Sequence, residues 1–327
     1  MSEAFEAFHI LQKLPTFIMT VQRKAREMHK KEKALFLLHW KQAKQAVALC
    51  IAGPCFSADV AREQEVDGFS DDQAAYHTGH LLEAGSNTTS NTLYAFVQAM
   101  LLFPEVQARG QQEIDRVAGP NHLPDLTDMA KLPYVRAMMK ESMRWFPTGP
   151  LGFPHAVTKD DTYRGYCIPA GATVAINIYG IHMDPARYPE PRRFNPDRHK
   201  EDSLSSADSA ANPDVSKRDH FAFGAGRRIC PGMHIVDRSL FFGIARLLWA
   251  FDIKPHVLPD GSSPKVDPDK YTHGFVCRPE SFEASITPRS AERERIIRRE
   301  WNIAKMGLDP ETLQWRELPE GMKKQKL

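Results

Sequence analysis

Apolar residues recur every three or four positions along most of the first 145 residues of the chain. This spacing is typical of amphipathic helices. It predicts helices over Glu105–Val117 and Leu132–Trp145, and a return to helix over Met233–Phe251. A longer helix can begin at Ser70, whose side chain can accept from free backbone N–H groups, and can run to Phe103, because the proline that follows cannot continue a hydrogen-bonded turn.

Weak helix formers occupy the middle of this long helix. The stretch Glu83–Ser90 reads Glu-Ala-Gly-Ser-Asn-Thr-Thr-Ser. Glycine destabilises a helix by about 1 kcal/mol relative to alanine, and serine, asparagine and threonine compete for backbone hydrogen bonds. We therefore expect a local break in the helix at this stretch, and such breaks often serve function.

After Pro147 the pattern changes to short segments bounded by glycine, proline and aspartate. The pattern predicts three strands: Thr162–Cys167, Thr173–Tyr179 and Phe275–Cys277. Lys200–His220 is rich in serine, aspartate, alanine and asparagine and is predicted to be a long surface loop. The charged tail from Ala291 predicts a peripheral helix and a loose end. The predicted fold class is mainly α (α+β), with small β-sheets beside a helical core.

The composition narrows the class of protein. The chain has 327 residues, of which 42% are apolar and 26% charged, so it can bury a large core. A formal net charge of +2 argues against a nucleic-acid-binding protein. The five cysteines form no CxxC pair, which indicates reduced thiols in an intracellular protein and argues against zinc held by thiolates. We expect Cys50, Cys55, Cys167 and Cys277 to be small core residues.

The beginning of the chain predicts neither a signal peptide nor a membrane span, because it lacks both a basic start and a long apolar run. Basic residues greatly outnumber acidic ones over Gln22–Ala48. The simplest interpretation is the solvated face of a helix. The alternative is peripheral contact with anionic lipid, assisted by the apolar patch Leu14–Met19.

One stretch of the chain carries the most specific chemistry. Phe223–Gly232 reads Phe-Gly-Ala-Gly-Arg-Arg-Ile-Cys-Pro-Gly, a glycine-rich turn that brings Cys230 to the start of the next helix. A helix N-terminus lowers the pKa of a thiol and favours its anion. Gly226 and Gly232 remove side chains where a flat cofactor must approach the backbone. Arg228 offers a cation that can pair with a carboxylate.

Two other interpretations of this cysteine stay open from the residues alone. It can be a structural cysteine buried at the start of a helix. It can also ligate a metal together with His234, four residues later, but that site needs further ligands that the sequence does not offer.

This stretch matches the haem-binding signature FxxGxRxCxG at every constrained position, so the chain resembles the cytochrome P450 family. The resemblance implies a haem (heme b, iron protoporphyrin IX) whose iron is ligated by the thiolate of Cys230. It also implies that Arg228 binds a haem propionate, that Phe223 packs near the thiolate and that Gly226 lets the haem approach. His155, which ends the segment Pro-Leu-Gly-Phe-Pro-His, is the second expected propionate ligand.

Glu141 and Arg144 lie three positions apart on one predicted helix, an ExxR pattern that is weak by itself. Beside the cysteine motif it resembles the Glu–Arg–Arg network of the family, with Arg198 as the third member. Because buried charges need partners, we expect these residues to support the cysteine loop and not to be catalytic. Phe153 and Thr272–Phe275 are expected to line the substrate pocket.

Ala84 and Gly85 resemble the oxygen-binding groove in the long central helix of the family. Thr88 is then the candidate that hydrogen-bonds the oxygen or an ordered water. The family usually has an acidic residue before this threonine, whereas this chain has Asn87. An amide can orient water but cannot exchange a proton at neutral pH. Three consequences are open: another group delivers protons, which we favour, oxygen activation is slow or uncoupled, or the haem chemistry is less usual.

The motifs occur in the order of the family up to about Ser290. We therefore expect a cytochrome P450 catalytic domain over residues 1–290, lacking its N-terminal part and amounting to about the C-terminal two-thirds of the fold. Residues 291–327 are expected to form a charged C-terminal tail. The membrane anchor, proline-rich hinge and early Trp-x-x-x-Arg haem contact of the family have no counterpart before the long helix, which indicates a fragment, a wrongly assigned gene product or a naturally shortened form.

The order and spacing of the motifs resemble fungal enzymes of the microsomal type, similar to O-methylsterigmatocystin oxidoreductases. The resemblance implies insertion of one oxygen atom from O2 into a lipophilic small molecule in secondary-metabolite biosynthesis, with electrons from NADPH through an NADPH–cytochrome P450 reductase. The full-length parent is expected on the cytoplasmic side of the endoplasmic reticulum membrane, and this chain, without a transmembrane segment, in the cytoplasm. The alternatives are a non-catalytic remnant and a haem-thiolate isomerase or dehydratase.

Overall fold

The computed structural model describes residues 20–53, 55–311, 313 and 315–317. Its contacts divide the chain into two units, residues 1–84 with 307–327 and residues 85–306. The helices are α3 (Thr20–Ala48), α4 (Phe56–Asp67), α5 (Asp71–Leu102), α6 (Pro104–Val117), α7 (Pro133–Trp145), α8 (Ile178–His182), α9 (Ser206–Ala211), α10 (Met233–Ala250) and α11 (Ala291–Met306). The strands are β1 (His155–Ala156), β2 (Asp161–Tyr163), β3 (Tyr166–Ile168), β4 (Thr173–Val174), β5 (Phe251–Pro255) and β6 (Ala284–Pro288). The predicted mainly α fold with small sheets is confirmed.

In the first unit, α3 and α4 pack through a small apolar cluster that includes Phe36 and Trp40. The indole N–H of the fully buried Trp40 donates to Asp71 at 3.0 Å. Asp71 also accepts from Lys44 at 2.8 Å and from Gln64 at 3.0 Å. These bonds hold the pKa of the Asp71 carboxyl well below its usual range, and the bond from Lys44 has the largest effect.

The other basic side chains of α3 agree with a solvated helix face. Most of them are exposed: Arg23, Lys24, Arg26, Lys30, Lys31 and Lys41. Lys33 is half-buried and pairs with Asp72 at the start of α5. The apolar patch Leu14–Met19 lies outside the described residues, so contact of this region with lipid stays a prediction.

The long helix α5 begins and ends where the sequence predicts. Ser70 and Gln73 cap its start reciprocally, because the Gln73 N–H donates to Ser70 Oγ at 3.2 Å and the Ser70 N–H donates to Gln73 Oε1 at 2.9 Å. The predicted break is wrong, since the backbone stays α-helical through Glu83–Ser90. Hydroxyl groups there satisfy carbonyls of the same helix instead of disrupting it, as Ser90 Oγ does when it donates to the Ser86 carbonyl at 2.8 Å.

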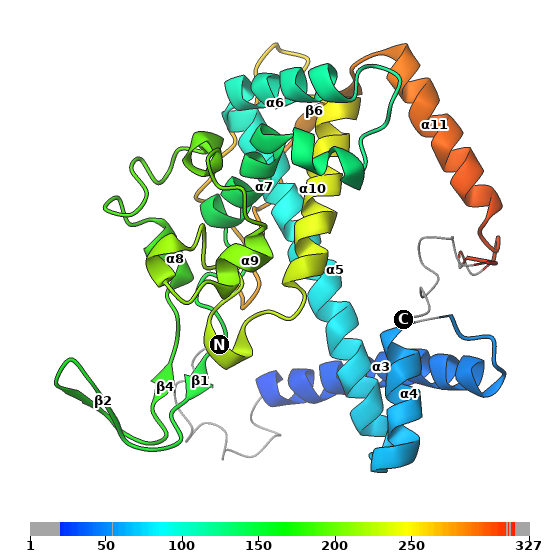
Figure 1. The fold of residues 1–327 in the computed structure, drawn as a ribbon, viewed down its shortest axis with the longest axis vertical. Coiled ribbons are helices and arrows are strands. Elements are labelled where there is room, and N and C mark those ends of the chain that lie inside the picture. The colour runs from blue at the N-terminus through cyan, green and yellow to red at the C-terminus, as the bar shows by residue number, and fades with distance from the viewer. Residues whose placement is uncertain (1–19, 54, 312, 314, 318–327) are drawn as a thin grey trace. The chain divides into compact units, whose positions relative to one another are not determined.

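In the second unit, the core lies where α6, α7 and α10 meet (Figure 1). The fully buried centre of this core is supplied by one face of α10: Leu240, Phe241, Ile244, Leu248 and Trp249. Gly110 of α6 allows the close approach of these helices, because a Cβ atom built there would lie 2.7 Å from Met138 Sδ and 3.0 Å from Leu248 Cδ1.

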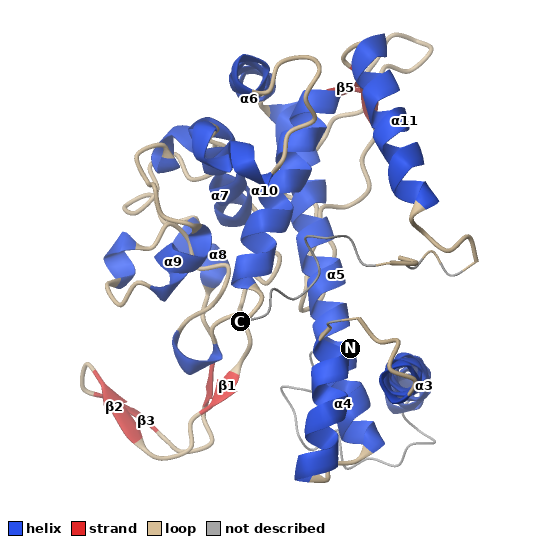
Figure 2. Ribbon diagram, turned by 45° about the vertical axis from the view of Figure 1, so that its right-hand side comes forward, coloured by secondary structure: helices blue, strands red, loops and turns tan. Residues whose placement is uncertain are grey.

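Three antiparallel sheets of two strands each complement the helices of the second unit, pairing β1 with β4, β2 with β3 and β5 with β6. The β2–β3 hairpin projects away from the helices (Figure 2). The β5–β6 sheet is joined to α6 by the buried Gln107. Its Nε2 donates to the Ile253 carbonyl at 2.9 Å, and its Oε1 accepts from the Ile253 N–H at 2.8 Å.

The predicted strands are corrected in three places. Thr162–Cys167 is a hairpin and not one strand, because Arg164 and Gly165 adopt positive φ angles of 51° and 84° and reverse the chain. The strand predicted over Thr173–Tyr179 ends at Val174, and α8 follows. Phe275–Cys277 forms no strand and lies in a loop.

The predicted surface loop Lys200–His220 is also wrong in part. It contains the short helix α9, capped by Ser205, whose Oγ accepts from the Asp208 N–H at 3.0 Å. Small residues on one face of α9 are buried and contact α10. The loop then ends in Asp219 and His220, which are both buried. Small polar residues therefore serve packing here, which composition alone does not distinguish from a solvated loop.

The cysteines differ from the prediction as well. Cys277 is buried as expected, but Cys50, Cys55 and Cys167 are exposed. Cys50 has a positive φ of 56° in a turn after α3, and Cys167 lies on the exposed hairpin. Among the described residues, no helix combines the length and apolar character that crossing a bilayer requires.

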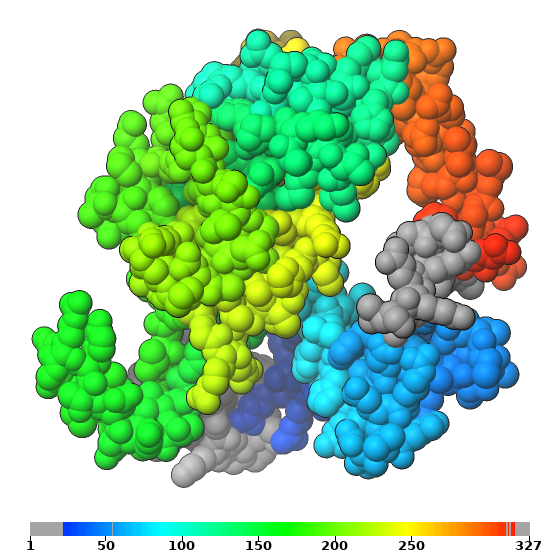
Figure 3. All heavy atoms as spheres, viewed as in Figure 1, coloured from blue at the N-terminus to red at the C-terminus, as the bar shows by residue number. Residues whose placement is uncertain are grey.

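Helix α11 follows β6 and is anchored only by its first half. Arg293 is buried and donates to Asp115 at 2.6 Å and to the Trp249 carbonyl at 2.9 Å, and Ile296 joins the core. The later turns are mostly exposed, and Figure 3 shows the atoms of α11 (orange) leaving the body of the second unit. The predicted peripheral helix of the tail is confirmed.

Replacing Gln107 with leucine tests the link between α6 and the β5–β6 sheet. Gln107→Leu leaves the buried N–H and carbonyl of Ile253 without partners, so we expect a loss of about 3 kcal/mol in the free energy of unfolding. Urea unfolding measures it. The matched control is Gln112→Leu, an exposed position on the same helix, which should change stability by less than about 0.5 kcal/mol. Equal effects of the two substitutions would contradict the proposed link.

Candidate functional site

The cysteine loop lies immediately before α10, and backbone bonds define its shape. Gly224 and Gly226 adopt positive φ angles of 74° and 71°, which residues with a side chain rarely adopt. The turn brings the Cys230 N–H to the Phe223 carbonyl at 2.9 Å. Phe223 is buried in the core, and Cys230 packs against the same cluster. The structure therefore brings these two predicted site residues together.

The Cys230 sulfur is half-buried at the N-terminus of α10. Burial raises the pKa of its thiol, and hydrogen bonds from the backbone N–H groups of Gly232 and Met233 oppose that effect without cancelling it. The sequence predicts a lowered thiol pKa from the helix N-terminus alone, so this prediction is wrong in sign: desolvation outweighs the two N–H groups. A bound metal cation deprotonates a coordinating thiol outright.

The residues around Cys230 fit a haem on the sulfur side. The donor is a soft sulfur toward which two N–H groups are already directed, as suits an iron-bound thiolate. A Cβ atom at Gly226 would meet nothing within 4 Å, so space is open beside the loop. Among the residues that the structure describes, the side chains of Arg228 and His155 make no hydrogen bond or ion pair, which leaves both able to bind a carboxylate.

The predicted oxygen-binding residues lie together on α5. Ala84, Gly85 and Asn87 are exposed and Thr88 is half-buried. The carbonyl of Thr88 accepts from Thr92 Oγ1 at 3.0 Å, which satisfies it within the helix. Ala84 ends the first unit and Gly85 begins the second, so the stretch stands where the contacts divide the chain.

The predicted network around Glu141 is present, with Glu141 and Arg144 fully buried and Arg198 half-buried. The Glu141 carboxylate accepts two hydrogen bonds from Arg144, both at 2.8 Å, and one from the Asn195 N–H at 2.9 Å. Arg198 Nε lies 3.5 Å from Glu141 Oε1, as the third member was predicted to do. His199, which the sequence interpretation missed, lies with Nε2 at 3.0 Å from Glu141 Oε2.

This network also binds backbone groups outside α7. Arg144 also donates to the carbonyls of His182 and Pro191, both at 2.9 Å. Burial by itself raises the pKa of Glu141, but the hydrogen bonds from Arg144 and His199 outweigh it, so the pKa is lowered overall. The carboxylate is therefore ionised, and its predicted support of the cysteine loop stays a prediction.

A second buried polar cluster adjoins the first and was not predicted. Lys140, which is 1% exposed, lies 2.6 Å from Asp202 and 3.1 Å from Asp219. The imidazoles of His182 and His220 are also buried, with ring centroids 6.4 Å apart. The residues come from four separate segments, so no spacing in the sequence could reveal the cluster.

The residues expected to line a substrate pocket are partly brought together. The rings of Phe153 and Phe275 are in contact, with centroids 4.2 Å apart and planes tilted by 47°, and both are exposed. A pocket of about 430 Å³ has Trp145, Tyr179 and Tyr271 in its wall. Phe153 and Phe275 are not among the residues that line it.

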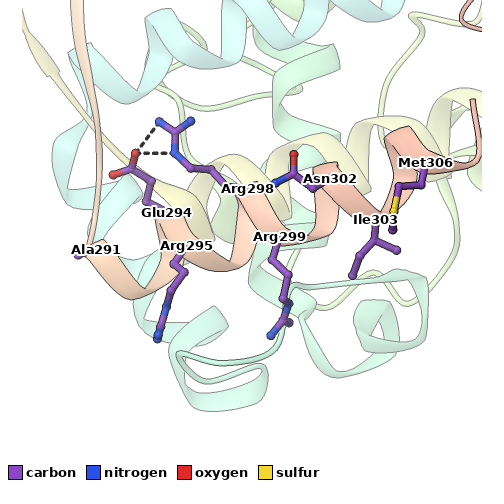
Figure 4. Close-up of a pocket in the computed structure, with 8 residues that line it drawn as sticks. All are labelled: Ala291, Glu294, Arg295, Arg298, Arg299, Asn302, Ile303 and Met306. Carbon is purple, nitrogen blue, oxygen red and sulfur yellow. Dashed lines mark hydrogen bonds and ion pairs between the residues drawn. The ribbon is translucent and has the colours of Figure 1, made fainter. Parts of the chain in front are cut away.

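A broader hollow of about 510 Å³ lies along the exposed side of α11. In Figure 4, Arg298 bonds Glu294 across one turn, while Arg295 and Arg299 point away together. The hollow is shallow and contains none of the predicted site residues, so the chemistry of the chain does not reside there.

A helical fold with a half-buried cysteine in a glycine-rich turn, together with a buried Glu–Arg pair, is what the sequence motifs predict of a haem-thiolate protein. The family model of cytochrome P450 matches residues 3–286. The chain belongs to the cytochrome P450 family, as the sequence motifs predict. Family membership implies a haem with a cysteine thiolate ligand.

Curated relatives and solved structures agree with this family. The chain is 48% identical over 320 residues to the cytochrome P450 monooxygenase virE of Hypocrea virens, covering 97% of this chain and 58% of that protein. It is 45% identical to the monooxygenase fsoB of Humicola fuscoatra, covering 98% of this chain and 59% of that protein. A zebra fish cytochrome P450 solved with progesterone superposes with a TM-score of 0.67 at 27% identity, covering 83% of this chain and 60% of that one. The chain thus spans somewhat under two thirds of the length of these proteins.

Glu141→Gln tests the supporting network. The substitution leaves the buried Arg144 without its counter-charge, so we expect a loss of about 3–5 kcal/mol in the free energy of unfolding at neutral pH. Because the pKa of Glu141 is lowered in the folded chain, its contribution is present above its ordinary value of 4.5 and disappears as the pH falls below that value. The difference between the two proteins should therefore shrink below about pH 4.5.

Urea unfolding at several pH values measures this difference. Glu105→Gln, at an exposed position of α6, is the control and should leave stability nearly unchanged at every pH. A loss that persists undiminished into acid would show that the ionised carboxylate does not hold the network.

Proposed function

We propose that this chain provides the haem-binding part of a monooxygenase that inserts one oxygen atom from O2 into a lipophilic small molecule. The observation that carries the proposal is the Cys230 sulfur, half-buried at a helix N-terminus and facing two backbone N–H groups within the family's loop. A thiolate-ligated haem supplies the capacity to activate dioxygen. The names of the fungal relatives, all monooxygenases, support this reading.

The residues of the chain have separable tasks in this proposal. Cys230 provides the sulfur ligand, and the N–H groups of Gly232 and Met233 keep that sulfur oriented and share its negative charge. Arg228 and His155 bind the two propionates, for which both side chains are available.

The positioning of oxygen and of water is assigned to α5. The Thr88 hydroxyl holds a hydrogen bond to oxygen or to an ordered water, and the Asn87 amide orients water without exchanging protons. Another group therefore delivers the proton. Ala84 and Gly85 carry no bulky side chain, so they leave room along the exposed side of the helix for the haem and the oxygen.

The partners follow from the same proposal. NADPH–cytochrome P450 reductase supplies electrons at the face of the cysteine loop, where the exposed Arg227 attracts an acidic surface. The substrate is a lipophilic intermediate of secondary metabolism, and the whole protein works at the cytoplasmic surface of the endoplasmic reticulum. Residues 1–290 form the catalytic domain, and residues 291–327 are a charged tail.

The Asn87 amide favours one second candidate function. A haem-thiolate isomerase or dehydratase needs neither dioxygen nor a reductase, and such a reaction does not need an acid before Thr88. Dependence of product formation on dioxygen and NADPH separates the two candidates.

Cys230→Ala tests the ligand assignment. The chain mixed with haem, reduced and exposed to carbon monoxide should give the strongly red-shifted Soret band of an iron–thiolate bond. Cys230→Ala should abolish that band, because alanine has no donor atom. Cys277→Ala, at a buried cysteine outside the loop, is the matched control and should keep it. A red-shifted band that survives in Cys230→Ala would refute the assignment.

Asn87→Asp tests the proton relay. Because another group is assigned to deliver the proton, we expect the hydrogen peroxide released per NADPH consumed to stay within about twofold of the parent protein. If position 87 limited the relay, a new carboxyl would change proton delivery by a factor on the order of 10². The measurement uses the holoenzyme with its reductase. Asn91→Asp, one turn along the same helix, controls for the added charge.

A further inference from the structure

The cysteine loop is entered through the segment Asp219–Phe223, which belongs to no helix or strand and is buried at Asp219, His220 and Phe223 and half-buried between them. Its backbone groups are therefore not satisfied by a regular ladder and need other partners. The Asp219 N–H donates to Ser209 Oγ at 2.8 Å, and the Asp219 carbonyl accepts from the Tyr188 hydroxyl at 2.9 Å. Side chains from elsewhere thus hold the start of the segment.

Two imidazole rings hold the middle of the segment. The Phe221 N–H donates to Nε2 of His182 at 2.8 Å, and the Ala222 N–H donates to Nδ1 of His220 at 3.2 Å. Directly after these two residues, the Phe223 carbonyl accepts from the Cys230 N–H at 2.9 Å. The chain from the two rings to the cysteine backbone is therefore continuous.

These bonds define the protonation state of both rings. A ring nitrogen can accept from an N–H group only when it carries no proton, so Nε2 of His182 and Nδ1 of His220 must be unprotonated. Each ring is then neutral, with its hydrogen on the other nitrogen. Both rings are almost fully buried, and burial lowers the pKa of each, in agreement with neutral imidazoles.

The second nitrogen of each ring makes no hydrogen bond to the residues that the structure describes, although Nε2 of His220 lies 3.7 Å from Asp219 Oδ1. Among the described residues, Nδ1 of His182 and Nε2 of His220 are buried and find no hydrogen-bond partner. A buried polar group without a partner destabilises a fold. A leucine or phenylalanine would fill the same space without that penalty, so the acceptor nitrogens, and not the volume of the rings, distinguish these residues.

We propose that His182 and His220 are positioning residues, two neutral acceptors that hold the Phe221–Phe223 backbone and thereby place Cys230 for thiolate ligation. The ring of His220 also contacts that of Phe223, with centroids 5.2 Å apart, so the side chain and the carbonyl of Phe223 are held together. Arg144 donates to the His182 carbonyl at 2.9 Å, which ties His182 to the Glu141 network. The role in ligation rests on the function proposed above.

Amide substitutions separate the acceptor from the size of the ring. The oxygen of glutamine reaches about as far as Nε2 of a histidine, and the oxygen of asparagine about as far as Nδ1. His182→Gln and His220→Asn therefore keep an acceptor in place, whereas His182→Asn and His220→Gln move it. Glutamine should therefore replace the acceptor better than asparagine at position 182, and asparagine better than glutamine at position 220.

The first readout needs no haem. Hydrogen exchange of the Phe221, Ala222 and Cys230 amides is measured in the chain itself, with amides of α6 as the internal reference. The misplaced variants, His182→Asn and His220→Gln, should exchange about tenfold faster at these amides, because one lost hydrogen bond confers about that factor. The matched variants, His182→Gln and His220→Asn, should exchange less than about threefold faster. Ile114→Ala, a fully buried change on α6, should raise exchange generally without this local pattern.

The second readout uses the haem-loaded chain. The fraction of reduced, carbon monoxide-bound haem with the red-shifted Soret band should fall in the misplaced variants and be restored in the matched ones. Ile114→Ala should keep that fraction unchanged in the protein that remains folded, because it is remote in sequence from the loop and lowers only overall stability.

The outcomes are distinguishable. Equal exchange in matched and misplaced variants at both positions would overturn the proposal. If glutamine preserves slow exchange at position 182 and asparagine does so at position 220, but the chain never shows the red-shifted band, the two histidines position the Cys230 backbone and the proposed monooxygenase function is wrong. The reciprocal order in exchange together with an unchanged Soret fraction would overturn the link to ligation.

Discussion

An anionic sulfur in a half-buried position is unfavourable unless a positive charge compensates it, and the cysteine loop depends on this constraint. Burial raises the pKa of the Cys230 thiol, although the N–H groups of Gly232 and Met233 oppose the shift. The helix N-terminus therefore prepares the geometry of the sulfur but does not ionise it. A metal that coordinates the sulfur supplies the missing charge. Because the thiol must lose its proton when a metal binds, metal binding and ionisation are one event.

A loop of this kind cannot rely on a sheet for its shape. The strands of the second unit are short, and none of them includes the cysteine loop. Buried charge takes over that role: Glu141 and Arg144 satisfy each other and then bind the backbone of neighbouring segments. A buried ion pair adds little net stability, yet removing one partner is strongly destabilising. Such a network therefore selects one arrangement of the loops more than it strengthens the fold.

The long helices and the cysteine motif could be predicted because their signals are local. The capping of α5 by Ser70 follows from a few adjacent residues, and the loop motif is contiguous. The predictions were wrong where contacts between segments distant in the sequence determine the local structure. The turn at Arg164 and Gly165 needs a positive φ at Arg164, a residue type that rarely adopts it. Helix α9 buries small polar residues, which by composition are typical of a loop. His182 could not be connected with the cysteine loop, because its partner Phe221 lies 39 residues away.

The polar residues near the cysteine differ in charge for a physical reason. Glu141 is ionised because cations surround it, whereas His182 and His220 are neutral because they accept hydrogen bonds in a desolvated site. If the two imidazoles carried protons, they would lose those bonds. The added charges would be repelled by Arg144 and Lys140, and burial keeps the pKa of His220 lowered although the Asp219 carboxylate raises it. Neutral acceptors hold the backbone without adding charge that the interior must compensate.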